Sequence, residues 1–170
     1  YMEIANRLCT LGYRETKTYL VASLFVIGNI VLPQLFHLVP QGGVMWLPIY
    51  FFTLVGAYKY GWQVGLLTAV LSPVVNSLFF TMPHASALPA ILLKSTLLVL
   101  FAGYAAHRFQ RVSLLLVLGV VLGYQVLGTL GEWAMKGDFY LAAQDFRLGL
   151  PGMALQVVGG YLVIKHLIRK

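Results

Sequence analysis

Charged and amide side chains lie inside long apolar segments of this chain, and they are the residues that could do chemistry. Lys94 is the clearest, because an amine within such a segment must pair, lose its charge, face water or reach the membrane surface. Three alternatives follow. Lys94 forms a structural ion pair with Glu132 or Asp145, it extends to the surface, or it binds an anionic or carbonyl-bearing ligand. In the last case Glu132 is expected to bind an amine or hydroxyl of that ligand.

The other polar candidates share a position, in the half of each apolar segment that lies away from the chain's basic clusters. The opposite halves are nearly free of polar side chains, so a polar cavity open at one end is the simplest explanation. Aromatic residues near this end could line a pocket for a flat ring or anchor the chain at the membrane surface. The candidate substrate-binding residues are Asn29, Gln34, Trp46, Tyr50, Asn76, His84, Lys94, Gln125, Glu132 and Gln156.

Catalytic and metal chemistry have little support in this sequence. No GxSxG, HExxH or CxxC motif is present, and no glycine-rich phosphate loop occurs. The four histidines, at 37, 84, 107 and 166, fall in pairs on opposite sides of the expected membrane. We therefore expect no enzymatic activity, no metal site and no resident cofactor.

Six apolar runs must position the candidate residues. A helix rises about 1.5 Å per residue, so about 20 apolar residues cross a hydrocarbon core about 30 Å thick. The chain is 59% hydrophobic with a mean hydropathy of +0.81, far more apolar than a soluble domain. We predict an all-α integral membrane protein, a six-transmembrane-helix bundle in one domain over residues 1–170, with an interfacial helix at about 134–147. The expected spans are about 19–38, 44–57, 62–80, 88–106, 113–133 and 148–168.

The basic residues predict the orientation. Most of the basic residues lie on the side of the expected membrane that holds both termini. Only Lys136 and Arg147 lie on the other side, and Lys94 lies inside an expected span. Basic residues stay in the cytoplasm during insertion, so both termini are expected to be cytoplasmic. The net charge of +7 then reflects topology and contact with lipid headgroups, not nucleic acid. The remaining basic residues lie on the side that holds both termini: Arg7, Arg14, Lys17, Lys59, Arg108, Arg111, Lys165, Arg169 and Lys170.

Small residues recur four positions apart, at the spacing that lets membrane helices approach closely. Packing within the molecule and binding of a partner are both compatible with this spacing. The pairs are Gly61 with Gly65, Ala102 with Ala106, and Gly119 with Gly123.

The layout resembles the substrate-binding S components of energy-coupling factor (ECF) vitamin transporters. It shares with them six spans in about 170 residues, a proline-containing second span, a short glycine-bounded turn, and a third span with a polar outer end. The matching positions are Pro48, Gly56, Gly61, Gly65, Asn76 and Pro83.

The resemblance implies that the protein lies in a bacterial or archaeal cytoplasmic membrane and captures a small vitamin or cofactor precursor from outside. A separate transmembrane coupling subunit and an ATPase pair would then drive uptake. Small residues on the first span, Ala22, Ser23 and Gly28, are the expected contact face for that subunit, although Val26 occupies one position of the family's small-residue pattern.

Two alternatives remain open. The first is a non-transporting scaffold similar to the six-span rod-shape protein of cell-wall elongation, which would not need Lys94 and Glu132 within the membrane. The second is a stand-alone channel or secondary carrier, in which polar residues would continue through the inner half.

Overall fold

The computed structural model describes residues 14, 16–36, 38, 50–80, 88–109 and 112–169, and every regular element within them is a helix. The all-α prediction is therefore confirmed for this part of the chain. The helices are α2 (Thr16–Phe36), α4 (Phe51–Tyr60), α5 (Trp62–Phe80), α6 (Leu88–Phe109), α7 (Leu114–Lys136), α8 (Phe139–Ala142), α9 (Gln144–Leu148) and α10 (Leu150–Arg169).

The helix ends differ from the predicted ones where glycine and local geometry intervene. The second apolar run was expected to extend to about 57, whereas helix α4 continues to Tyr60 and ends at Gly61, whose φ of 101° suits glycine alone. Helix α7 extends to Lys136. The next residue, Gly137, ends the helix with a φ of 71°, and the Gly137 N–H donates to the carbonyl oxygen of Trp133 at 2.7 Å. The segment predicted as an interfacial helix, about 134–147, contains the end of α7 and the two short helices α8 and α9, and its place at the membrane surface stays a prediction.

Among the described residues, three helices are long and apolar enough to cross a membrane: Trp62–Phe79, Leu88–Phe109 and Leu114–Lys136. They give the molecule the character of a membrane helical bundle. The ten residues of α4 rise only about 15 Å, half the thickness of a hydrocarbon core. The six-span topology and the side on which the termini lie stay predictions.

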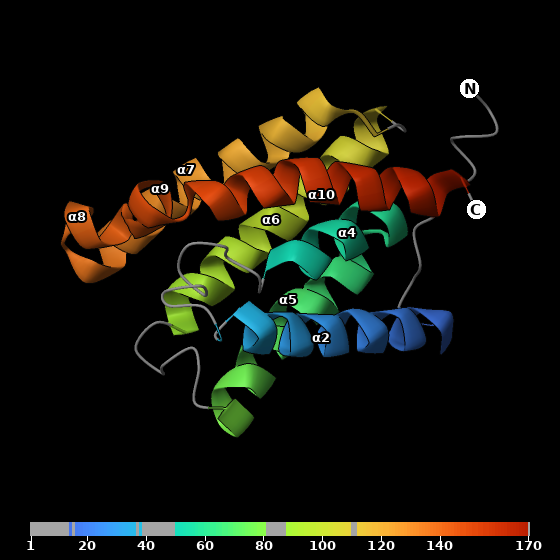
Figure 1. The fold of residues 1–170 in the computed structure, drawn as a ribbon, viewed down its shortest axis with the longest axis horizontal. Coiled ribbons are helices and arrows are strands. Elements are labelled where there is room, and N and C mark those ends of the chain that lie inside the picture. The colour runs from blue at the N-terminus through green and yellow to red at the C-terminus, as the bar shows by residue number, and fades with distance from the viewer. Residues whose placement is uncertain are drawn as a thin grey trace.

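The helices α2, α4, α5, α6, α7 and α10 run in alternating directions along the bundle (Figure 1). The start of α2, the α4–α5 turn, the end of α6 and the end of α10 lie at one end, at the right of the view. We call this the basic end, because Lys17, Lys59, Arg108 and Lys165 lie close to these helix termini. The end of α7, the start of α10 and the short helices α8 and α9 lie at the opposite end.

Helix α4 forms the centre of the bundle. Its seven consecutive residues from Thr53 to Lys59 are buried, and it packs against α2, α5, α6 and α10. Close approach to α5 requires a glycine: a Cβ at Gly65 would lie 2.5 Å from Ala57 Cβ and 2.8 Å from its Cα. The core around α4 includes Leu54 and Tyr58, both almost wholly buried.

The predicted small-residue pairs have different roles. Ala102 and Ala106 are buried and Gly123 lies against Phe101, so these three serve packing within the molecule. Gly61 forms the α4–α5 turn, whereas a Cβ at Gly119 would meet nothing within 4 Å. The expected close contact through the Gly119–Gly123 pair is therefore made at Gly123 alone, because Gly119 faces outward.

Candidate functional site

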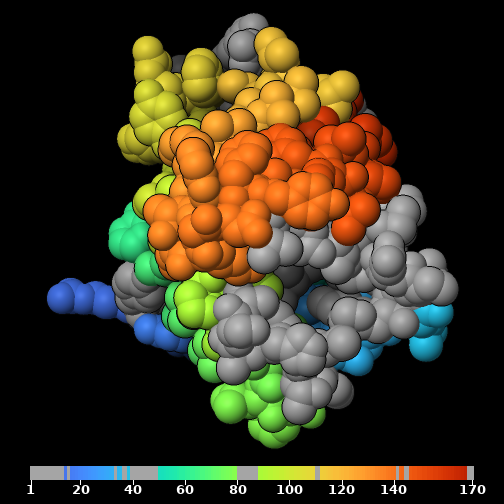
Figure 2. All heavy atoms as spheres, turned by 90° about the vertical axis from the view of Figure 1, so that its left-hand side faces the viewer, coloured from blue at the N-terminus to red at the C-terminus, as the bar shows by residue number. Residues whose placement is uncertain are grey.

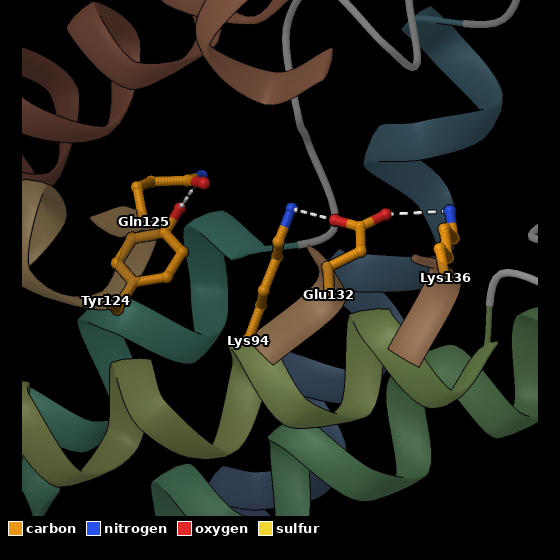
Figure 3. Close-up of polar contacts among 5 residues, drawn as sticks. All are labelled: Lys94, Tyr124, Gln125, Glu132 and Lys136. Atoms are coloured by element: carbon orange, nitrogen blue, oxygen red, sulfur yellow. Dashed lines mark hydrogen bonds and ion pairs between the residues drawn. The ribbon is translucent and has the colours of Figure 1, made fainter. Parts of the chain in front are cut away.

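A bridge of three charged side chains joins α6 to the end of α7. Lys94 Nζ lies 2.7 Å from Glu132 Oε2, and Lys136 Nζ lies 2.7 Å from Glu132 Oε1 (Figure 3). Lys94 and Glu132 are almost fully buried, whereas the Lys136 side chain is 33% exposed. Of the alternatives for Lys94, the ion pair with Glu132 is thus present, and the side chain of Asp145 lies outside the described residues.

Glycines on α7 make room for this bridge. A Cβ at Gly128 would lie 2.6 Å from Lys94 Cγ, and one at Gly131 would lie 2.4 Å from Leu93 Cδ2. The stem of Lys94 therefore lies directly on the α7 backbone, with its amine directed along α7 toward Glu132. Position 94 is seven residues into α6 and position 132 is four residues from the end of α7, so the bridge lies near the end opposite the basic end.

The short helices α8 and α9 lie at the same end of the molecule. Figure 2 looks onto this end and shows residues of α8 and α9 (orange) at the surface beside the start of α10 (red-orange). Arg147 on α9 lies over the Tyr140 ring of α8, with its guanidinium carbon 3.6 Å from the ring centroid, and donates from Nε to the Tyr140 carbonyl oxygen. This contact holds the two short helices together.

A second polar group lies deeper along α7 and joins α7 to α10. Tyr124 donates its hydroxyl hydrogen to Gln156 Oε1 and accepts a hydrogen bond from Gln125 Nε2 at 2.9 Å. All three side chains are almost fully buried. The ring of Tyr50, just before α4, packs against that of Tyr124 with centroids 5.6 Å apart.

Three buried oxygens in this part of the bundle have no hydrogen-bond partner in the described part of the chain. They are Ser95 Oγ on α6, and Gln125 Oε1 and Thr129 Oγ1 on α7. Gln125 and Thr129 are one helical turn apart on the α7 face that also carries Glu132, and Ser95 follows Lys94. The Lys94–Gly128 contact sets α6 and α7 in register, so Ser95 and Thr129 lie at similar depth.

We call these five side chains the polar layer: Lys94, Ser95, Gln125, Thr129 and Glu132.

Asn29 and Asn76 belong to a separate network that joins α2, α4 and α5. Asn29 donates to the hydroxyls of Thr53 and Ser72, both at 3.1 Å, and its Oδ1 accepts from the Phe52 N–H at 3.2 Å. Asn76 donates to the carbonyl oxygens of Asn29 and Ser72. These two predicted site residues therefore hold helices together. The hydrogen bonds account for the burial of the Asn29 side chain, whereas Asn76 Oδ1 is buried without a partner.

The structure places the predicted site residues in two groups. Lys94, Gln125 and Glu132 belong to the polar layer, and Tyr50 and Gln156 reach it through Tyr124. Asn29 and Asn76 lie in the α2–α4–α5 network, and Gln34 lies partly buried near the end of α2. Trp46 and His84 lie outside the described residues, as do His37, Pro48 and Pro83.

The predicted partner face on α2 is largely used inside the molecule. Ala22 is buried against Val64 of α5, and a Cβ at Gly28 would lie 2.8 Å from the Phe52 ring of α4. Only Ser23 is exposed, with its hydroxyl donating to the carbonyl oxygen of Tyr19 at 2.7 Å. Ala22 and Gly28 therefore serve packing within the molecule, and a partner face on α2 stays a prediction.

Sequence reasoning missed several residues that the structure brings into the site. Lys136 follows Glu132 by four positions, the spacing of a helical ion pair, and could have been found from that alone. Thr129 lies between Gln125 and Glu132 on the same helical face, so a search at helical spacing would also have included it. Ser95 had no such signal, because serines are common in helices that cross membranes.

The polar layer offers buried groups that can donate or accept hydrogen bonds and pair charges. Among the described residues, no group of three or more His, Cys, Asp or Glu side chains could hold a metal ion.

Comparison with protein-family models, with curated proteins and with solved structures found no match.

Proposed function

We propose that this protein is the substrate-binding subunit of an ECF-type importer and that it binds a small vitamin or cofactor precursor at the polar layer. The observation that carries the proposal is the set of three buried oxygens without partners, on Ser95, Gln125 and Thr129. Buried polar atoms in folded proteins are almost always hydrogen-bonded, so three such atoms on the packed helices α6 and α7 support a binding site for a further molecule.

The charge distribution supports a membrane-embedded binding subunit. Three helices have the length and hydropathy of membrane spans, and the basic end lies opposite the polar layer. With the basic end in the cytoplasm of a bacterium or archaeon, the polar layer lies near the outer surface, where it would receive a substrate. The transmembrane coupling subunit and the ATPase pair belong to this proposal as separate chains.

One observation favours the scaffold as a second candidate. Glu132 pairs with both lysines within the structure, so Lys94 needs no ligand to compensate its charge. In a scaffold the bridge would simply fix α6 against α7.

Ligand binding separates the two candidates. We expect native mass spectrometry of the purified protein in detergent to show a retained small molecule, and that compound to raise the melting temperature of ligand-free protein. Gln125→Met and Thr129→Val should weaken this binding. Thr53→Val, in the separate Asn29 network, is the matched control and should leave affinity unchanged. Absence of any retained compound, together with unaltered melting in extracts of growth medium, would favour the scaffold.

Coupling to partner subunits needs its own test on the exposed face of α2. Because Ala22 and Gly28 contact neighbouring helices, their enlargement would disturb the fold. Ser23→Trp is the informative change, and it should block uptake of the retained compound in cells while leaving its binding in detergent intact. Leu100→Trp, at an exposed position of α6, is the control and should permit uptake. Equal uptake by the two variants would argue against a partner at this face.

A further inference from the structure

The direction of the hydrogen-bond chain at Tyr124 determines which atom Gln125 offers to a ligand. A tyrosine hydroxyl has one hydrogen, and Tyr124 donates it to Gln156 Oε1. The hydroxyl can then only accept from Gln125, and Gln125 supplies an N–H from Nε2 at 2.9 Å. The amide is thereby oriented, and its remaining carbonyl oxygen, Oε1, stays buried without a partner (Figure 3 shows the Tyr124–Gln125 contact).

The charged groups of the polar layer have their main partners already. Each carboxylate oxygen of Glu132 lies 2.7 Å from a lysine amine, and one of those amines is that of Lys94. An anionic ligand would have to displace Glu132 from Lys94, which would cost a buried ion pair. A neutral ligand can bind without disturbing the bridge.

From these two observations we propose that the site binds a neutral small molecule through an N–H or O–H group that donates to Gln125 Oε1. The hydroxyls of Ser95 and Thr129, which can donate or accept, complete the contacts with a neighbouring polar atom of the same ligand. Amides, lactams, cyclic ureas and heteroaromatic rings with an N–H have the required chemistry. This inference rests on the proposed binding function and specifies its ligand class.

The test uses matched pairs of probes on the purified full-length protein. Each pair contains a small cyclic or aromatic amide, lactam or urea with an N–H and its N-methylated counterpart, and binding is measured by thermal shift and isothermal titration. The N–H member should bind about tenfold more tightly, because the N-methylated member cannot form the hydrogen bond and leaves the buried acceptor Gln125 Oε1 unsatisfied. Gln125→Met should remove this preference. Gln63→Met is the control, since Gln63 Oε1 is also buried without a partner but lies at the start of α5, near the basic end.

Tyr124→Phe gives a second readout. Without the hydroxyl the Gln125 amide is free to rotate, so it can present either its oxygen or its N–H₂ group. The ratio of the affinities for the N–H and N-methylated probes should therefore be smaller in this variant than in the unaltered protein, even if the affinity for the best probe falls little.

Three results would overturn the inference. Equal binding of both members of each pair shows that Gln125 Oε1 does not select the ligand, while leaving the binding function in place. Tighter binding of the N-methylated members, or of carboxylates, shows that the hydrogen-bond chain or the ion pair is reorganised. Absence of binding by every probe contradicts the proposed function itself and the inference with it.

Discussion

Removal of single charges from the Lys94–Glu132–Lys136 bridge should destabilise the protein unequally. Glu132→Gln takes the carboxylate from both lysines, and Lys94 is 3% exposed while Glu132 is 6% exposed. Breaking a buried pair by removing one partner costs about 3–5 kcal/mol, because the remaining charge stays desolvated. We expect the free energy of unfolding to fall by about that amount.

Lys94→Met should cost less, although it breaks the same pair. Glu132 keeps Lys136 at 2.7 Å, so its charge is still compensated, and the methionine retains most of the apolar stem against Gly128. We expect a loss of about 1–3 kcal/mol, typical for a charged hydrogen bond. Lys136→Met should cost about 1 kcal/mol or less, because its side chain is 33% exposed and the pair has helical spacing.

Equilibrium unfolding in mixed micelles, followed by tryptophan fluorescence and circular dichroism, measures these differences. Lys17→Met, which removes an exposed lysine at the basic end, is the control and should be nearly neutral. The Lys94→Met/Glu132→Gln double variant should lose less than the sum of the two single changes. Equal losses for Lys94→Met and Glu132→Gln, or strict additivity in the double variant, would refute the reasoning.

Further predictions address packing, the internal network and topology. Gly65→Ala should destabilise the protein by about 1–3 kcal/mol through overpacking against the α4 backbone, whereas Gly119→Ala should be neutral or stabilising; equal effects in an unfolding assay would contradict this. Asn29→Leu should cost about 2 kcal/mol, since three side-chain hydrogen bonds at about 0.6 kcal/mol each are lost, and a neutral result would dismiss the network. A cysteine at Arg108 should react with a membrane-impermeant reagent only in permeabilised cells and one at Tyr140 in intact cells, so the reverse pattern would invert the topology.

Apolar run length predicted most of the helical elements. The expected spans 62–80, 88–106 and 113–133 match α5, α6 and α7, with ends shifted by up to three residues. The errors arose where hydropathy carries no information about the backbone. Gly56 lies inside α4, whereas Gly61 ends that helix because its φ is positive.

The site was only partly predictable for a related reason. Periodicity shows that Asn29 and Lys94 are both polar groups among apolar neighbours, and it cannot show which partners each of them finds. The structure satisfies Asn29 with Thr53 and Ser72, residues 24 and 43 positions away in the chain. Such pairing depends on the angles at which the helices cross. No local pattern in a single sequence specifies these angles.

The central position of α4 has a consequence for the order of assembly. The ribosome releases α4 before α10, yet these two helices pack against each other. Until α10 is made, the face of α4 that carries Leu54, which packs against Gly160 of α10, stays uncovered. A nascent chain that stops before α10 should therefore be a substrate for membrane chaperones and quality-control proteases, and synthesis of the 20 residues of α10 should be the event that covers α4.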